Sequence, residues 1–419
     1  AQWPQADFIV GNPPFIGKLR MREALGDGYV EALRGAWPEV PESSDFVMFW
    51  WHRAAGEVAA GRTRRMGLIT TNSLTMVFNR RVVQAALDKG THLEMAIPDH
   101  PWVDGANGAA VRIAMTVLAA GEGEGVLNHV ISEQSGEHGE VSVTLRGATG
   151  LVHADLKVGA NVAKASPLRA NEAMSHMGVI LVGAGFIVQP GDPLLQLEPG
   201  PIKPYMNGRD LTQTSRGVFV IDLAGLTLDE VRSKYPHCYQ RLYDTVRVER
   251  AVSRDIYLRE NWWLFRRTNL QLRSSLAGLN RYIGTTETAK HRTFSFIDGA
   301  VLPDQKIRVI TLDDSLSLGV LSSSLHVQWA LATGGTLEDR PVYNSSICFG
   351  TFPFPNEDTG LTPALRDRIA QLAEQIDAHR KRVLAPESGN TGLTLTGLYN
   401  VLAALREGRA LTAKEKTQH

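Results

Sequence analysis

Four consecutive residues near the start of the chain, Asn12-Pro13-Pro14-Phe15, combine hydrogen-bond acceptors with an aromatic ring on a stiff backbone. The Asn12 side-chain oxygen and the Pro13 carbonyl could each accept a hydrogen bond from an exocyclic amine, and Phe15 could stack on the ring that carries it. An adenine fits this set, because its amine has two protons to donate. An enzyme that modifies a base must lift the base out of the duplex and hold it by its edge and its face.

The residues before these four place them at the end of a strand. Phe8-Ile9-Val10 is a short apolar run of high β propensity, long enough for a buried strand end, and Gly11 lets the chain turn. Each proline fixes its own φ and disfavours the α region for the residue before it, so the loop is rigid. Open α/β sheets bind ligands at this edge. The structural alternative is a Pro-Pro turn with a cap-like Asn; the preceding strand and the following aromatic residue favour function.

This stretch resembles motif IV of the amino-group DNA methyltransferases, in which Asn, Asp or Ser precedes Pro-Pro and Tyr or Phe. A second strand, Met66 to Thr70, ends in Thr71-Asn72-Ser73 and resembles motif VI, a neighbouring strand whose polar tip borders the target pocket. The resemblance implies a catalytic loop of Asn12-Pro13-Pro14-Phe15 and a target-base pocket with Asn72 and Ser73. Asp7, just before the first strand, is the candidate for cofactor contact.

Helical and strand patterns alternate through the first part of the chain. Helices are expected at Asp45–Gly61, with Ser43-Ser44-Asp45 as the cap region, and at Asn79–Lys89. Leu93–Ala96 and Ala109–Leu118 read as strands, with a turn-rich loop, Asp99–Gly105, between them. This alternation is typical of the doubly wound α/β sheet.

Charge is unevenly spread along a chain of zero net charge. Residues 245–310 hold twelve Lys and Arg against six Asp and Glu, and aromatic residues lie among them. Localised positive charge of this kind suits contact with nucleic-acid phosphates, and the alternative is a solvated face with its own ion pairs. The candidates for DNA contact are Arg266, Arg267, Lys290, His291 and Arg292.

Several ordered motifs resemble the target-recognition domain of type IIL, MmeI-like DNA methyltransferases and of related phage-defence methylases. They include Trp262-Trp263-Leu264-Phe265-Arg266-Arg267, Ala289-Lys290-His291-Arg292, Leu302-Pro303-Asp304 and Phe349-Gly350-Thr351-Phe352-Pro353-Phe354-Pro355. The resemblance runs from Asp7 to about Asn400. It implies a γ-type adenine-N6 methyltransferase that uses S-adenosylmethionine (SAM) on double-stranded DNA, with restriction or defence subunits as possible partners.

The predicted fold is α/β: an incomplete class I (Rossmann-like) methyltransferase domain, then an α+β target-recognition domain and C-terminal helices. The expected limits are residues 1–125 for the catalytic part, 126–200 for a connecting region, 201–356 for the recognition domain and 357–419 for the helical end. The first C-terminal helix, Thr362–Leu384, carries Leu365, Ile369, Leu372, Ile376 and Val383 on one face. Leu393–Leu405 is expected to form the second.

The cysteine content and the lengths of the apolar runs exclude disulfide-rich, zinc-cluster and membrane-spanning proteins. Two cysteines, Cys238 and Cys348, predict neither a disulfide framework nor a zinc cluster and fit a reducing cytoplasm. No His/Cys cluster has metal-ligand spacing. No stretch approaches the ~20 apolar residues of a membrane span, and there is no signal peptide.

A complete class I methyltransferase has a Gly-rich loop after its first strand, where SAM binds, and no such loop precedes Asp7. We therefore expect a fragment, with half of the catalytic domain and the whole recognition domain. Two alternatives stay open. One is a non-catalytic module that binds DNA and provides the sequence specificity of another subunit. The other is an enzyme that methylates RNA or a protein glutamine, and the presence of a DNA-recognition domain makes this alternative less favoured.

A first prediction concerns SAM. The chain by itself should bind SAM weakly or not at all, because the loop that cradles the cofactor is not in the sequence. Isothermal titration of the purified chain with SAM checks this, and a dissociation constant in the micromolar range would contradict it.

Overall fold

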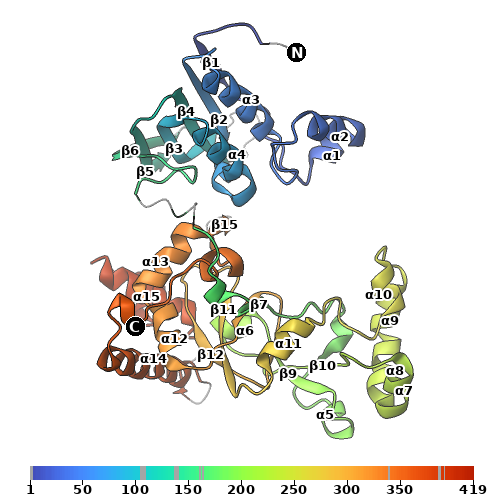
Figure 1. The fold of residues 1–419 in the computed structure, drawn as a ribbon. Coiled ribbons are helices and arrows are strands. Elements are labelled where there is room, and N and C mark those ends of the chain that lie inside the picture. Colours follow the sequence, from blue (N-terminus) through green and yellow to red (C-terminus); the bar gives the residue numbers. More distant parts are fainter. Residues whose placement is uncertain are drawn as a thin grey trace. The chain divides into compact units, whose positions relative to one another are not determined.

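The computed structural model describes residues 3–103, 110–135, 141–159, 162, 165–337, 340–385, 388–390 and 392–419. The chain divides into two compact units, an N-terminal unit, Ala1–Lys164, and a C-terminal unit, Ala165–His419 (Figure 1). Each unit has its own hydrophobic core and is described by itself.

A six-stranded sheet in the order β1-β2-β4-β3-β5-β6 forms the centre of the N-terminal unit (Figure 1). Its strands are β1 (Phe8–Gly11), β2 (Arg65–Thr71), β3 (Thr91–Val103), β4 (Ala110–Ala120), β5 (Gly125–Ser135) and β6 (Val141–Gly150). β1 and β2 are parallel, β4 lies antiparallel between β2 and β3, and β3 and β5 are parallel. The expected α/β fold is confirmed, with β4 and β6 as reversed strands whose direction the sequence pattern did not reveal.

In the part of this unit that the structure describes, the α-helices beside the sheet are α1 (Met21–Leu25), α2 (Asp27–Ala36), α3 (Val47–Ala59) and α4 (Val77–Leu87). Burial along β2 alternates, so that Met66, Leu68 and Thr70 are buried on one face. α3 contacts β2 and β4, and the indole nitrogen of Trp51 donates to Thr116 Oγ1 at 3.1 Å inside the core. The expected helices at Asp45–Gly61 and Asn79–Lys89 therefore correspond to α3 and α4.

Three details of the N-terminal unit differ from expectation. Phe8 and Val10 are 54% and 84% exposed, so β1 buries only one face, with Ile9 against the core. The expected loop Asp99–Gly105 is wrong up to Val103, because β3 continues through these residues after an irregularity; residues 104–105 lie outside the described residues. β5 pairs with β3 and extends the sheet beyond residue 125, and the compact unit ends at Lys164.

The C-terminal unit contains two four-stranded sheets, β13-β9-β10-β8 and β12-β11-β14-β7, and the hairpin β15-β16. The strands are β7 (Ser175–Met177), β8 (Ile187–Val188), β9 (Ile202–Met206), β10 (Phe219–Ile221), β11 (Arg281–Thr286), β12 (Ser295–Asp298), β13 (Leu302–Pro303), β14 (Ile307–Ile310), β15 (Gly335–Leu337) and β16 (Arg340–Val342). One hydrophobic cluster includes residues of the sheet β13-β9-β10-β8. Two other clusters include residues of β11, β12 and β14 from the second sheet.

Helices surround both sheets of this unit (Figure 1). They are α5 (Leu194–Leu197), α6 (Gly208–Thr212), α7 (Leu228–Lys234), α8 (Pro236–Asp244), α9 (Val246–Ala251), α10 (Ile256–Glu260), α11 (Leu270–Leu276), α12 (Ser315–Ser322), α13 (Ser324–Thr333), α14 (Pro363–Leu384), α15 (Leu395–Arg406) and α16 (Ala413–Lys416). In the described parts of the chain, no helix combines the length and the apolar character that crossing a membrane requires.

The helix α14 forms as expected, but its buried face is not the apolar one. Leu365, Leu372 and Ile376 are 39–50% exposed, whereas Asp377 and Arg380 are buried. The reason is that these charged side chains bind the β12 region: Asp377 Oδ1 accepts from the Phe296 amide at 3.2 Å, and Arg380 donates to the Phe294 carbonyl at 2.9 Å. Hydrogen-bonded charges can replace apolar residues inside a fold, which periodicity alone does not reveal.

Candidate active site and nucleic-acid interface

The loop Asn12-Pro13-Pro14-Phe15 leaves the carboxyl end of β1 beside the end of β2. Gly11, the last residue of β1, is paired with Leu68, and the parallel strand β2 continues to Thr71 before Asn72 and Ser73 follow. Parallel neighbours end at the same edge of a sheet, so the two predicted site segments leave one edge of the N-terminal unit.

The hydrogen-bond acceptors of this loop are available. Asn12 is exposed, and within the described residues neither its side chain nor the Pro13 carbonyl has a hydrogen-bond partner. Pro14 is exposed, and Phe15 is half-buried and packs against the core. The loop therefore presents two unpaired oxygens and a partly anchored aromatic ring, a set that can take the edge of a base with an amine.

Asn72 and Ser73 lie in a single 3₁₀ turn after β2 and are half-buried. The Asn72 amide nitrogen donates to Asp99 Oδ1 at 3.3 Å, and Asp99 also receives a bidentate pair from Arg112. The Ser73 hydroxyl donates to Asp45 Oδ2 at 2.6 Å. Both polar tips are thus held by other side chains of the unit.

The cap region expected at Ser43-Ser44-Asp45 does not cap a helix. α3 begins at Val47 and no side chain caps its first turn; Asp45 instead accepts from the Lys18 amide at 3.0 Å and from Ser73. A carboxylate just before a helix is usually read as a cap, so the sequence offered no signal for these long-range bonds. Asp7 lies exposed before β1, and its carboxylate makes no hydrogen bond within the described residues.

A polar cleft of about 650 Å³ lies in the C-terminal unit, at the end of β11 and beside α6. Four positively charged side chains line it: Arg209, Lys290, Lys306 and Arg340. We call it the basic cleft. Within the described residues, the side chains of Arg209 and Lys290 are exposed and form no ion pair. A cation that binds a phosphate group must be accessible in this way.

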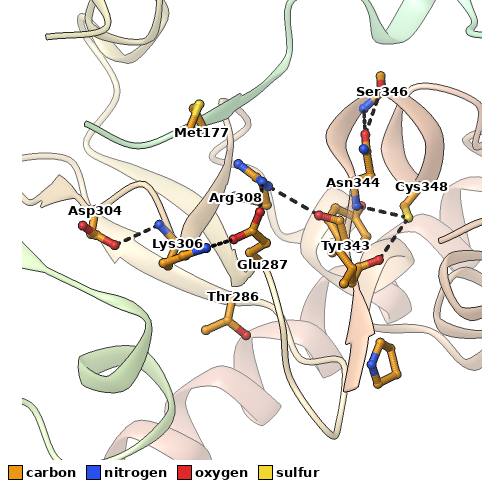
Figure 2. Close-up of polar contacts among 12 residues, drawn as sticks. Met177, Thr286, Glu287, Asp304, Lys306, Arg308, Tyr343, Asn344, Ser346 and Cys348 are labelled. Carbon is orange, nitrogen blue, oxygen red and sulfur yellow. Dashed lines mark hydrogen bonds and ion pairs between the residues drawn. The ribbon is translucent and has the colours of Figure 1, made fainter. Parts of the chain in front are cut away.

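Glu287 forms ion pairs with Lys306 of this cleft and with Arg308 beside it. Figure 2 shows its carboxylate between Lys306, whose Nζ is 2.7 Å away, and Arg308. Lys306 remains 62% exposed, whereas Arg308 is only 15% exposed and also donates to the Tyr343 carbonyl. Lys306 therefore faces solvent at the cleft, and Arg308 belongs to the support beneath it.

Asp304 also lines the basic cleft, and its carboxylate accepts two hydrogen bonds. Its carboxylate accepts from the Lys306 amide at 2.9 Å and from the Tyr205 hydroxyl at 2.8 Å. Burial, together with Asp304, raises the pKa of the Tyr205 phenol, which keeps it a donor.

The three neighbours Lys290, His291 and Arg292 have different environments. Lys290 is exposed in the basic cleft, and His291 is half-buried with Nε2 at 2.9 Å from Asn400 Oδ1. Arg292 is buried, and its guanidinium donates to Thr285 Oγ1 and to the carbonyls of Thr286 and Pro341. The prediction of direct DNA contact is therefore corrected for Arg292, because a guanidinium saturated by interior acceptors does not face a ligand.

A prediction on stability follows for Arg292, whose pKa is lowered to about 10 by burial, so that it is still charged at neutral pH. Arg292→Met should destabilise the C-terminal unit by about 3 kcal/mol, because buried carbonyls lose their donors. Urea unfolding followed by fluorescence measures the change. Arg254→Met removes an exposed guanidinium and should change stability by less than about 0.5 kcal/mol; equal effects of the two variants would refute the structural role.

Arg266 and Arg267 are exposed and do not line the basic cleft. Arg266 pairs with Asp255 at 2.7 Å, and Arg267 donates to the sulfur of Met177 at 3.3 Å. Several other cations of residues 245–310 serve the fold: Arg250 is buried among carbonyls, and Arg273, Arg281 and Arg308 form ion pairs. The alternative of internal ion pairs thus accounts for a large part of this charge.

Sequence reasoning did not single out Arg209 or Arg340 for the basic cleft. A signal for the first existed: Asn207 and Asp210 form a capping box that starts α6, and Arg209 lies in its first turn. No local signal marks Arg340, because β16 reaches the cleft through contacts between residues distant in sequence, such as Thr288 with Val342 and Ala289 with Pro341.

Two family models match the chain. Residues 2–127 match the DNA-methyltransferase domain of MmeI, and residues 198–356 match the target recognition domain of MmeI. Among curated proteins, no match is found.

Comparison with solved structures gives one match that covers nearly the whole chain with a high TM-score. The chain is similar to the type IIL restriction-modification enzyme MmeI in complex with DNA, with a TM-score of 0.71 and 19% identity over 98% of this chain and 52% of that one. It thus spans about half the length of that protein. The DrdV–DNA complex (TM-score 0.36, 12% identity, 89% and 44% of the two chains) and the type IIG endonuclease BpuSI (0.29, 10%, 88% and 49%) are too distant to support an argument.

The order of the two matched domains agrees with the order of the two sites, a strand-end loop followed by a basic cleft. Through its methyltransferase domain and its target recognition domain, the chain belongs to the MmeI-like family.

Proposed function

We propose that the protein is a site-specific, SAM-dependent DNA methyltransferase that modifies N6 of adenine in a restriction-modification or phage-defence system of the cytoplasm. The observation that carries the proposal is the pair of unpaired acceptors at the carboxyl end of β1, the Asn12 side-chain oxygen and the Pro13 carbonyl. A cytosine amine could use the same acceptors; the resemblance to γ-type enzymes favours adenine.

These two acceptors need only bind the protons of the amine and make its nitrogen a better nucleophile. An adenine amine is a poor nucleophile because its lone pair is delocalised into the ring. Hydrogen bonds from both amine protons to Asn12 and Pro13 favour the tetrahedral nitrogen of the transition state, in which the lone pair is localised. Phe15 holds the ring by its face. These bonds strengthen as the reaction proceeds, so they raise the rate and not merely the affinity.

SAM supplies an electrophilic methyl group when it is bound. Asp7 is the candidate for contact with SAM, and a single exposed carboxylate without fixed partners does not define a nucleoside site. The described residues therefore do not by themselves fit the cofactor, and no step of the proposal depends on Asp7.

The basic cleft is the proposed DNA-binding element of the C-terminal unit. Arg209, Lys290, Lys306 and Arg340 would contact phosphates and position the duplex. Arg266, Arg267 and His291 remain candidates for contact with the same DNA. Gln213 also lines the cleft and is exposed, and an amide side chain of this kind suits the edge of an adenine.

The proposal is tested by expressing the full-length protein in a host without DNA methylation and sequencing the host genome by a method that detects N6-methyladenine. The expected result is methylation of one short motif, lost in Asn12→Ala. Methylation only at cytosine, or at no site, would overturn the adenine assignment. A non-catalytic recognition module is the alternative: it would bind duplex DNA through the basic cleft and leave no methyl mark even with SAM in excess.

A further inference from the structure

One carboxylate of the N-terminal unit joins three segments that are distant in sequence. Asp45 Oδ1 accepts from the Lys18 amide at 3.0 Å, and Asp45 Oδ2 accepts from the Ser73 hydroxyl at 2.6 Å and from Asn79 Nδ2 at 2.9 Å. Lys18 lies three residues after Phe15, so these bonds connect the proposed catalytic loop to the end of β2 and to α4.

Asn79 completes the connection from the other side. It is 4% exposed; its Oδ1 accepts from the Asp45 amide at 3.0 Å, and its Nδ2 also donates to the Ser73 carbonyl at 3.0 Å. One backbone bond runs in parallel, from the Phe46 amide to the Ile16 carbonyl at 2.9 Å. The donors and acceptors match one another, and an amide is needed at 79 because its nitrogen donates to a carboxylate and a carbonyl.

These bonds hold the far end of the loop in place. The near end is held by the pairing of Gly11 with Leu68, and two prolines stiffen the residues after it. The Asn12 side chain makes no bond of its own within the described residues, so the position of its oxygen depends on these two anchors. Displacing a reacting group by about 1 Å can cost 10²-fold in rate.

We propose that Asp45 is a positioning residue for methyl transfer, which acts through Lys18, Ser73 and Asn79 to keep the Asn12-Pro13-Pro14-Phe15 loop in its reactive position. The inference rests on the proposed function for its catalytic consequence. Its structural part, the anchoring of the loop by Asp45, stands without it.

Asp45→Asn tests the proposal, because it keeps the shape but places an amide nitrogen opposite the Asn79 or Ser73 donors. We expect kcat for DNA methylation to fall about tenfold while the KM for DNA stays within about twofold, since the basic cleft lies in the other unit. In the purified chain, amide hydrogen exchange should become faster at Phe15 to Lys18 and at Ser73, and the melting temperature should fall by only a few degrees.

Two matched variants sharpen the test. Asn79→Asp removes the amide nitrogen that donates to Asp45 and to the Ser73 carbonyl, so it should lower kcat and speed exchange in the loop as Asp45→Asn does. Asp27→Asn removes a carboxylate that is 78% exposed on α2 and should leave exchange in the loop and kcat as in the unaltered protein.

The outcomes separate the two proposals. If Asp45→Asn exchanges and methylates like the unaltered protein, or if the loss appears in KM instead of kcat, Asp45 does not position the loop. If the unaltered full-length protein methylates no DNA, the proposed function fails, and the exchange experiment still decides whether Asp45 anchors the loop.

Discussion

Asn12→Ala should lower kcat for adenine methylation by about 10²-fold or more in the full-length protein, with DNA affinity nearly unchanged. The substitution removes one of two acceptors that act mainly in the transition state, and the loss of one pre-organised partner of this kind typically costs about 10²–10³ in kcat. Asn12 is exposed and makes no hydrogen bond within the described residues, so its removal leaves no partner unsatisfied and should not destabilise the fold. Single-turnover methylation of a duplex that holds the recognition motif measures the effect.

The control for this prediction is Asn12→Asp. A carboxylate keeps acceptors at the same position, and the related motif IV sequences accept Asp there, so a substantial part of the rate should return. Near-normal turnover in Asn12→Ala would refute the assigned role. A loss of equal size in Asn12→Ala and Asn12→Asp would show that the amide is needed for more than accepting a hydrogen bond.

The double substitution Arg209→Ala with Lys290→Ala should weaken binding to every duplex alike. Each phosphate contact contributes about 0.9 to the slope of log K against log salt, so losing two should lower the slope by about two and reduce affinity about 60-fold at 0.1 M salt. Both side chains are exposed in the basic cleft and form no ion pair within the described residues, so little stability should be lost. Anisotropy titrations across a salt series provide the slope, and no knowledge of the recognition motif is needed.

A matched control removes the same charge elsewhere in the C-terminal unit. Arg232 on α7 and Arg366 on α14 are exposed and do not line the basic cleft. Arg232→Ala with Arg366→Ala should change the slope by much less than two. If the two double variants have the same slope, the attraction comes from the general charge of the unit, and the basic cleft is not the surface that contacts phosphates.

Arg292 shows that a count of charged residues along the sequence does not reveal which of them are exposed to a ligand. In the sequence it stands beside Lys290 in one polar segment and looks equally suited to DNA. In the structure the two side chains face opposite environments, since Lys290 lines the cleft and Arg292 donates to interior carbonyls. Adjacent residues can differ in this way wherever the chain passes between core and surface.

The sequence by itself determined the local features of this protein. A β-prone run, one glycine and two prolines restrict backbone angles within a few residues, and the short strand β1 with its stiff loop forms as expected. The helices α3, α4, α14 and α15 follow from composition and periodicity, which are also local properties. The ordered motifs along the chain identified the family, which the two domain matches confirm.

Only the tertiary structure decided which residues meet and which are buried. The reversed strand β4, the exposure of Val10 and the burial of Arg292 depend on what packs against each element. The basic cleft assembles residues from the segments 207–213, 286–290 and 304–306 with Arg340 and Thr396, and Asp45 meets Lys18 and Ser73 from 27 and 28 positions away. Backbone preferences act over a few residues, whereas hydrogen bonds and burial join residues that the folded chain brings together, so the anchors and the cleft could not be read from spacing alone.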